Sequence, residues 1–170
     1  MTDLSFLGTP NHRKDILDFW PHPDRPPRPI QVTALKWLQE QSKKAKYLIM
    51  EAPVGSGKSY IGLTFSRWLS AQTSAAGRGD SYILTPQRIL QEQYETEFKK
   101  DFVVPFYGKS NYRCEEKNTT CDIGELVKPD CSNCVFSAAK KRAQEAPNTV
   151  LNYKLAMLAF AYTNSFKPEN

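Results

Sequence analysis

Apolar residues recur three and four positions apart in three stretches of the chain, a spacing that gives a helix one buried face. The helices predicted from this spacing span residues 30–42, 57–72 and 87–100. Their largest apolar side chains are expected in the core, and these are Trp37, Trp68 and Phe98. Short apolar runs at residues 47–51 and 81–85 predict two strands, each placed before a helix.

The pattern changes after residue 106. Residues 107–134 are polar and show no sustained period. A basic helix is predicted at residues 135–145, a third strand at 148–152 and a further helix at 153–162. Strands that alternate with helices predict an α/β fold, in which a parallel sheet is flanked by helices and the crossover is right-handed.

The start of the chain has a different character. Prolines are frequent between residues 21 and 29, which excludes a helix or a central strand there. Residues 1–29 are therefore predicted to form an extended arm. Small residues and glycines at residues 73–80 predict a surface connection.

The composition narrows the functional classes. The chain has 170 residues, 40% of them hydrophobic, which is enough for one sizeable core. A net charge of +5 and a pI near 9.0 suit a nucleic-acid partner. Neither a signal peptide nor an apolar run of membrane-spanning length is visible. We therefore expect a cytoplasmic protein, or a nuclear one in a eukaryote, whose cysteines serve as metal ligands more readily than as disulfides.

The most informative stretch is residues 51–59, with the sequence EAPVGSGKS, between a predicted strand and a predicted helix. Glycines here let backbone N–H groups curl around a phosphate, and the helix N-terminus adds its positive dipole end. Lys58 has the reach for the β- and γ-phosphates, and the Ser59 hydroxyl can bind Mg²⁺. Ala52 replaces the first glycine of the common pattern, outside its phosphate-facing part. The expected nucleotide-binding residues of this loop are Pro53, Val54, Gly55, Ser56, Gly57, Lys58 and Ser59.

Four cysteines lie in the polar stretch, separated by six, nine and two residues, and they are Cys114, Cys121, Cys131 and Cys134. Their polar and charged neighbours argue against the burial of four unrelated thiols. Zinc and iron–sulfur clusters both accept four thiolates. Zinc sites favour two closely spaced pairs, whereas only one such pair is present. The spacing thus favours a metal site and leaves its metal open.

Several short sequences, in a shared order, resemble the XPD/DinG family of iron–sulfur-containing superfamily 2 helicases. RPIQ at residues 28–31 resembles the adenine-reading Q motif, and EAPVGSGKS resembles motif I. TPQRILQEQ at residues 85–93 resembles motif Ia, which contacts the DNA backbone. YGKSNYRC at residues 107–114 resembles the start of the family's cluster domain, and VLNY at residues 150–153 resembles the asparagine and tyrosine that follow it.

This resemblance implies an ATP-dependent DNA helicase with a RecA-like domain interrupted by a [4Fe-4S] domain. Its parts would be an arm at 1–29, the first part of motor domain 1 at 30–106, the iron–sulfur domain at 107–146 and a return to motor domain 1 at 147–170. Arg28 and Gln31 would frame adenine, and Lys58 and Ser59 would serve catalysis with ATP and Mg²⁺. The four cysteines would hold the cluster, with zinc as the alternative metal.

Contacts with single-stranded or forked DNA are expected from two groups of residues. Thr85 and Gln87 lie at the carboxyl end of a predicted strand, where open α/β sheets bind their ligands. The second group combines charges for phosphates with a ring for base stacking, and it comprises Lys109, Asn111, Tyr112 and Arg113. A basic run at residues 140–142 fits either a DNA contact or a solvated helix face.

The sequence departs from the helicase pattern in one respect. No Asp-Glu pair follows an apolar strand, although these helicases need an acidic box and a second motor domain for phosphoryl transfer. We therefore expect an N-terminal helicase fragment that does not turn over ATP alone, with the remainder of the helicase as its partner. Two alternatives stay open, namely a zinc-binding nucleic-acid-binding module and a truncated, non-catalytic interaction protein.

Overall fold

A computed structural model of the chain describes residues 15–73, 81–98, 102–127 and 134–163. The chain divides into two compact units, residues 1–81 and 82–170. The connection was predicted at residues 73–80; Thr73 is the last residue of α2, and the rest of this stretch lies outside the described residues. No helix in the described ranges is long and apolar enough to cross a bilayer.

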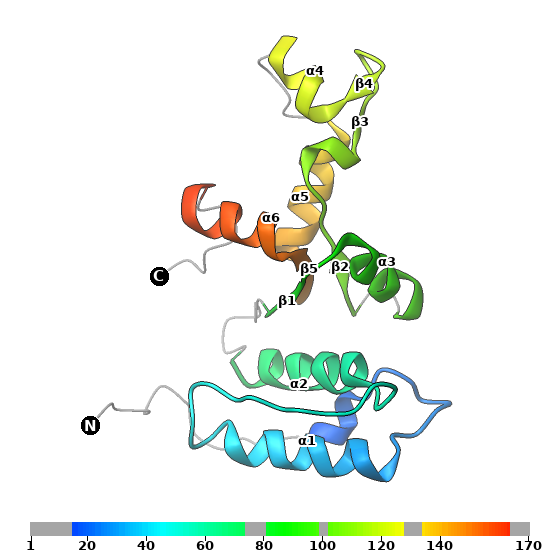
Figure 1. Cartoon of the computed structure of the whole chain (residues 1–170), viewed down its shortest axis with the longest axis vertical. Coiled ribbons are helices and arrows are strands. Elements are labelled where there is room, and N and C mark those ends of the chain that lie inside the picture. Colours follow the sequence, from blue (N-terminus) through cyan, green and yellow to red (C-terminus); the bar gives the residue numbers. More distant parts are fainter. Residues whose placement is uncertain (1–14, 74–80, 99–101, 128–133, 164–170) are drawn as a thin grey trace, which may run out of the picture. The chain divides into compact units, whose positions relative to one another are not determined.

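The first unit is built on two helices, α1 (Pro29–Gln41) and α2 (Lys58–Thr73), which lie side by side (Figure 1). A short 3₁₀ helix, η1 (Ile16–Phe19), contacts both of them. Buried apolar side chains of all three elements form one core, comprising Ile16, Leu35, Leu38, Ile61 and Trp68. The predicted helices at residues 30–42 and 57–72 are thus confirmed to within one residue.

The N-terminal arm differs from its prediction. Residues 20–28 contain no helix, as their prolines require, but η1 precedes them and Ile16 is 0% exposed. The physical reason is that η1 carries apolar side chains, and burying them against α1 and α2 has a lower free energy than exposing them to water. The arm is therefore anchored to the first core.

The strand predicted at residues 47–51 is not observed. This segment has no regular secondary structure and no hydrogen-bonded neighbour strand among the described residues. Leu48 and Met50 pack against the first core, whereas the side chains of Tyr47 and Ile49 are 81% and 92% exposed. The apolar run predicted a strand buried on both faces, and only one face is covered.

The second unit contains a three-stranded sheet with the order β1-β5-β2. Strands β1 (Ser81–Thr85) and β5 (Asn148–Asn152) have their predicted bounds. The middle strand, β5, pairs in parallel with β2 (Val104–Pro105), which the sequence did not predict. A parallel sheet flanked by helices confirms the α/β class and fits a RecA-like domain.

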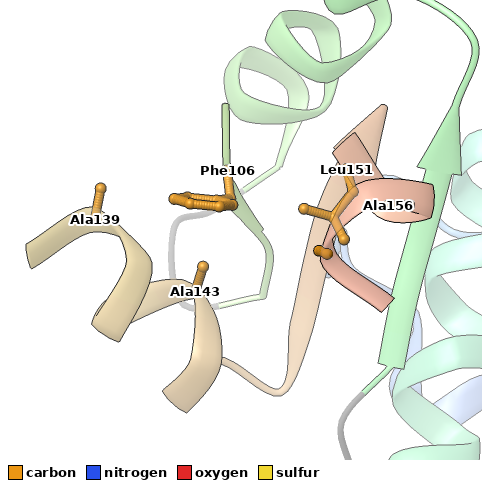
Figure 2. Close-up of a cluster of buried hydrophobic side chains, with 6 residues drawn as sticks. Phe106, Ala139, Ala143, Leu151 and Ala156 are labelled. Atoms are coloured by element: carbon orange, nitrogen blue, oxygen red, sulfur yellow. The ribbon is translucent and has the colours of Figure 1, made fainter. Parts of the chain in front are cut away.

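Three helices accompany this sheet (Figure 1), namely α3 (Arg88–Glu97), α5 (Val135–Glu145) and α6 (Tyr153–Leu158). Helix α6 continues as a π-helical turn, η3 (Ala159–Thr163). Figure 2 shows the ring of Phe106 between two alanines of α5, Ala139 and Ala143, and Leu151 of β5. This cluster is the core of the second unit.

The buried face of α3 is polar at its centre. Gln91 is 0% exposed, and its Nε2 donates to the carbonyl oxygens of Phe106, at 2.9 Å, and Val150, at 3.2 Å. Ile89, an apolar residue of the same helix, is 62% exposed. Because the buried carbonyl oxygen of Phe106 needs a donor, a glutamine satisfies the position better than an aliphatic residue.

The predictions that three aromatic side chains lie in the core have different outcomes. Trp68 and Phe98 are each 4% exposed, which confirms their prediction. Trp37 is 40% exposed, so its prediction is wrong. The core face of α1 is carried by Leu35 and Leu38, and Trp37 lies beside this face rather than on it.

Residues 107–127 form small local elements. A 3₁₀ turn, η2 (Lys109–Asn111), leads into an antiparallel hairpin of β3 (Arg113–Cys114) and β4 (Thr119–Thr120). Helix α4 (Cys121–Val127) follows directly. Asn118 lies in the hairpin turn with φ 51°, a left-handed conformation that asparagine tolerates. Elements this short leave no hydrophobic period in the sequence.

Candidate functional site

The glycine-containing loop before α2 has the backbone that its sequence predicts. Gly55 and Gly57 have φ values of 78° and 82°, which favour glycine because they crowd a Cβ. Helix α2 begins at Lys58, directly after this turn. A helix leaves its first N–H groups without intrahelical partners, so the end of the loop offers donors to an anion.

The polar side chains of this loop have unequal surroundings. Lys58 Nζ donates to the carbonyl oxygens of Ala52 and Pro53, both at 2.9 Å. Ser59 lies in the first turn of α2 and is half-buried. The hydroxyl oxygen of Ser56 is buried and has no hydrogen-bond partner among the described residues. A buried orphan hydroxyl in a polar loop indicates a group that gains its partner when a ligand binds.

Two side chains from the start of α1 contact the same loop. Arg28 Nη2 donates to the carbonyl oxygen of Gly55 at 2.8 Å, and Gln31 Nε2 donates to that of Ser56 at 3.0 Å. Gln31 Oε1 also accepts from the backbone N–H of Arg28 at 2.8 Å. The structure thus brings Arg28 and Gln31 to the predicted phosphate loop. The contact of either side chain with adenine stays a prediction.

An aromatic cluster that was not predicted from the sequence lies at the first turn of α2. The ring of Tyr60 stacks on Trp20, with centroids 5.5 Å apart, and its hydroxyl lies 3.3 Å from Nε2 of His22. Trp20 Nε1 donates to the carbonyl oxygen of Arg25 at 2.6 Å. These contacts hold the proline-rich segment against the helix that carries Ser59.

The predicted DNA-contacting residues of the second unit have paired side chains. Lys109 forms an ion pair with Glu125, Asn111 accepts from Arg88, and Arg113 donates to Asn118. Asn111 and Arg113 are exposed, and Lys109 is half-buried. Tyr112 differs, because its ring packs against Phe106 and Phe136 in the core.

The two predicted residues at the end of β1 also differ from each other. Thr85 is 4% exposed, and its hydroxyl lies 3.2 Å from the carbonyl oxygen of Gln87 and 3.5 Å from that of Leu151. Gln87 is exposed and is the N-cap of α3. Thr85 thus ties β1 to β5, and Gln87 remains accessible to a ligand.

Arg88 is a residue that the sequence reasoning missed. Its guanidinium bonds to Glu92 and Asn111 and lies 5.6 Å from the ring centroid of Tyr107. Burial, together with a hydrogen bond to Glu95, raises the pKa of Tyr107 far above its ordinary value, so this hydroxyl stays protonated and donates. Arg88 therefore joins α3 to residues 107–111. The pattern of residues along the sequence does not reveal this contact between distant segments.

Three of the four cysteines lie in described segments, around α4. Cys114 ends β3, Cys121 begins α4 and Cys134 is the N-cap of α5. A Cβ added to Gly124 of α4 would lie 2.8 Å from Sγ of Cys114. The thiol of Cys134 forms a hydrogen bond with Cys121.

The helix N-terminus also acts on Cys134. Its Sγ accepts from the backbone N–H of Ser137 at 3.4 Å. Partial burial raises the pKa of this thiol, but the hydrogen bonds from Ser137, Phe136 and Cys121 together outweigh burial and leave the pKa below its ordinary value. Cys131 lies outside the described residues. Within the described ranges, no group of three or more histidine, cysteine, aspartate or glutamate side chains is arranged to hold a metal ion.

A known protein family matches most of the chain. The family model described as "Type III restriction enzyme, res subunit" matches residues 24–157, which is most of the chain. This match begins before Arg28 and extends beyond β5, so it covers parts of both units. No match was found among curated proteins or among solved structures.

Proposed function

The chain belongs to the family of the type III restriction enzyme res subunit, a superfamily 2 family of helicase type, and we propose that it binds ATP with Mg²⁺ at residues 53–59. The observation that carries this proposal is the loop itself. Two glycines with positive φ lead directly into a long helix, and a buried serine hydroxyl beside them has no partner. This combination is more typical of a phosphate-binding loop than of an ordinary turn.

Each side chain of the loop has a role in this proposal. The backbone of residues 53–57 surrounds the phosphates. Lys58 leaves the carbonyl oxygens of Ala52 and Pro53 and neutralises the negative charge of the phosphates. The Ser59 hydroxyl is a ligand for Mg²⁺. The bound nucleotide supplies the phosphoryl group, while these residues bind it and orient it. Turnover requires further groups that stabilise the transferred phosphate.

A calorimetric titration of the full chain with ATP and Mg²⁺ tests nucleotide binding. Lys58→Ala is expected to weaken ATP binding at least about tenfold, because a charge-assisted contact with the phosphates is lost. The matched control is Lys44→Ala, an exposed lysine beyond the end of α1, which is expected to leave the affinity unchanged. Equal affinity of Lys58→Ala and the unsubstituted chain would contradict the proposal.

We further propose that the chain is of the iron–sulfur XPD/DinG type, with a [4Fe-4S] cluster held by Cys114, Cys121, Cys131 and Cys134. The close approach of Cys114 to α4, the Cys121–Cys134 contact and the helix N-cap position of Cys134 support this proposal. A helix N-terminus favours thiolate, the form that binds metal. The alternatives are zinc in the same site, or a non-catalytic interaction protein with intact metal and no ATPase activity.

Metal analysis of anaerobically purified protein tests the cluster. About four irons and four sulfides per chain, with broad absorbance near 400 nm, are expected. One zinc without sulfide would favour the zinc-binding module. Gly124→Ala is expected to lower the metal content, since its Cβ would collide with Cys114. Gly108→Ala is the matched control, because a Cβ there meets only Asn111 at 3.8 Å.

We also propose that single-stranded or forked DNA binds to the second unit. Gln87, Asn111 and Arg113 are exposed, and Lys109 lies close to Asn111 and Arg113 in the sequence. Thr85 and Tyr112 pack beneath this surface and hold its segments in place. Fluorescence anisotropy with labelled single-stranded DNA, forked DNA and RNA distinguishes the partners. Unchanged DNA affinity in an Asn111→Ala, Arg113→Ala double variant would contradict this surface.

A further inference from the structure

Arg88 lies between the two groups of residues that we propose as DNA contacts. It follows Gln87, the N-cap of α3, and its side chain bonds to Asn111 of η2. We propose that Arg88 is a positioning residue, which holds η2 to α3 so that Gln87 and Arg113 form one contact surface for single-stranded DNA. This inference rests on the proposed DNA surface and assigns it an internal support.

The guanidinium of Arg88 makes three contacts within the second unit. Its Nε donates to Oε1 of Glu92, one turn along α3, at 2.7 Å, and its Nη1 donates to Oδ1 of Asn111 at 2.5 Å. Its central carbon lies 5.6 Å from the ring centroid of Tyr107. A guanidinium is planar and presents its donors as a rigid fork, so it can serve two acceptors and face a ring at once. The contacts fix this side chain although it is exposed.

The segment that receives these contacts is bonded at both of its ends. The Nδ2 of Asn111 donates to the carbonyl oxygen of Gly108 at 3.1 Å, and the backbone N–H of Asn111 donates to the same oxygen at 2.9 Å. The carboxamide oxygen of Asn111 accepts from Arg88. At the other end, the hydroxyl of Tyr107 donates to Oε2 of Glu95 at 3.0 Å. The start and the end of this segment are therefore both joined to α3.

The charges on this face of α3 argue against Arg88 as a direct phosphate contact. Glu92 neutralises the guanidinium, and Glu95 adds a second carboxylate one turn further along the helix. A phosphate would have to displace the carboxylate of Glu92 and approach two like charges. Arg113, in contrast, donates to a neutral partner, Asn118, and keeps its charge for a phosphate. The role that remains for Arg88 is to hold its neighbours in place.

Hydrogen exchange of the full chain without DNA tests whether Arg88 holds this segment. Peptides covering residues 107–113 report on the N–H groups of Asn111 and Tyr112, which close the turn of η2. Arg88→Ala removes every contact of the guanidinium, whereas Arg88→Lys keeps the charge and loses the fork. Both variants are expected to exchange about fivefold faster in these peptides, which corresponds to one lost hydrogen bond.

Fluorescence anisotropy with labelled single-stranded DNA tests the positioning role. Arg88→Ala and Arg88→Lys are each expected to weaken DNA binding about fivefold, because the energy that holds η2 in place must then come from binding. A direct phosphate contact predicts instead that Arg88→Lys binds almost normally, since lysine also binds phosphate. The matched control is Lys154→Ala, which removes the same charge from an exposed position of α6 and is expected to change neither measurement. Circular dichroism verifies the folding of each variant.

The outcomes separate the positioning role from the DNA surface. If Arg88→Lys binds DNA normally and Arg88→Ala does not, Arg88 contacts phosphate and the positioning role is wrong. If exchange in residues 107–113 is unchanged in both variants, Arg88 does not hold the segment and the proposal is also wrong. Faster exchange with normal DNA binding in both variants would limit Arg88 to a role in stability and overturn the positioning role. If the unsubstituted chain binds no DNA, the proposed surface is refuted and the positioning role with it, whereas the exchange result still decides whether Arg88 holds the segment.

Discussion

Gly57 and Gly62 lie on either side of the first turn of α2, and alanine at these positions is expected to have opposite effects. At Gly57 alanine adopts a φ of 82° and displaces Gln31 from the carbonyl of Ser56. Left-handed strain and one lost hydrogen bond together cost about 2–3 kcal/mol. At Gly62 a Cβ meets nothing within 4 Å. There alanine is expected to add about 0.5–1 kcal/mol of stability through helix propensity.

Urea unfolding followed by tryptophan fluorescence measures both changes. All three tryptophans, Trp20, Trp37 and Trp68, lie in residues 1–81, so this signal reports on the first unit. A Gly57→Ala variant as stable as the unsubstituted chain would show that the loop relaxes without strain.

Asp15 makes the stability of the first unit depend on pH. A hydrogen bond from Lys36, together with one from the N–H of Leu17, lowers the pKa of Asp15. The carboxylate is thus favoured in the folded chain. Its stabilising contribution is present above the ordinary pKa of about 4 and is lost as the pH falls through the lower, folded value. The charge pair also fastens η1 to α1.

The expected result is that Asp15→Asn removes part of the stability at pH 7 and has little effect at pH 2. Tryptophan fluorescence in urea at the two pH values measures this difference. Asp18→Asn, in the same short helix, is the control, because the described structure gives Asp18 no ion pair. An equal effect of Asp15→Asn at both pH values would mean that the lost packing, and not the charge, matters.

At the scale of elements, Gln91 joins α3 to two strands. Gln91→Leu is expected to destabilise the second unit by about 2–4 kcal/mol, because the carbonyls of Phe106 and Val150 lose a buried donor. Gln93→Leu, at an exposed position of the same helix, is the control and is expected to change stability by less than about 0.5 kcal/mol.

The measurement is urea unfolding followed by circular dichroism and tryptophan fluorescence in parallel. The fluorescence transition is expected to stay in place, since the tryptophans lie in the other unit. A Gln91→Leu variant with an unchanged dichroism transition would show that water replaces the side-chain donor.

The sequence predicted those elements whose boundaries are marked locally. Residues 135–145 and 148–152 have the predicted bounds, since a helical period gives way to an apolar run within a few residues. Strand β2 was missed because it has two residues, one of them proline, and exists only through pairing with β5. The segment 47–51 was misassigned for the related reason that an apolar run does not reveal whether a partner strand covers it.

The candidate site was predictable to a similar degree. Positive φ at Gly55 and Gly57 follows from the residue type. The bonds of Arg28 and Gln31 to the loop, the burial of Thr85 and the packing of Tyr112 depend on where distant segments meet. Residue type alone predicts polar chemistry at these positions, but it does not distinguish a ligand contact from a structural hydrogen bond.

At the scale of the whole molecule, the net charge of +5 predicts how DNA binding responds to salt. The logarithm of the affinity for single-stranded DNA is expected to fall linearly with the logarithm of the salt concentration, by about 0.7 for each phosphate contact. Arg113→Ala is expected to reduce this slope by about 0.7, since one contact is lost. Anisotropy titrations between low and physiological salt measure the slope.

The matched variant is Lys43→Ala, which removes the same charge from an exposed position beyond the end of α1 in the first unit. It leaves the slope unchanged if the contacts lie where we propose. Equal reductions of the slope in both variants would instead indicate that DNA is attracted by the net positive charge of the whole protein and not by specific contacts.

The π-helical turn at residues 159–163 has an evolutionary consequence. A π turn holds one residue more than an α turn, so it absorbs a single inserted residue. An insertion into a regular helix would otherwise rotate every later side chain by about 100° about the helix axis. Relatives of this chain are therefore expected to differ in length by one residue here. The shorter chains would continue α6 as an unbroken α-helix, and an alignment gap at this point would mark an ancient insertion.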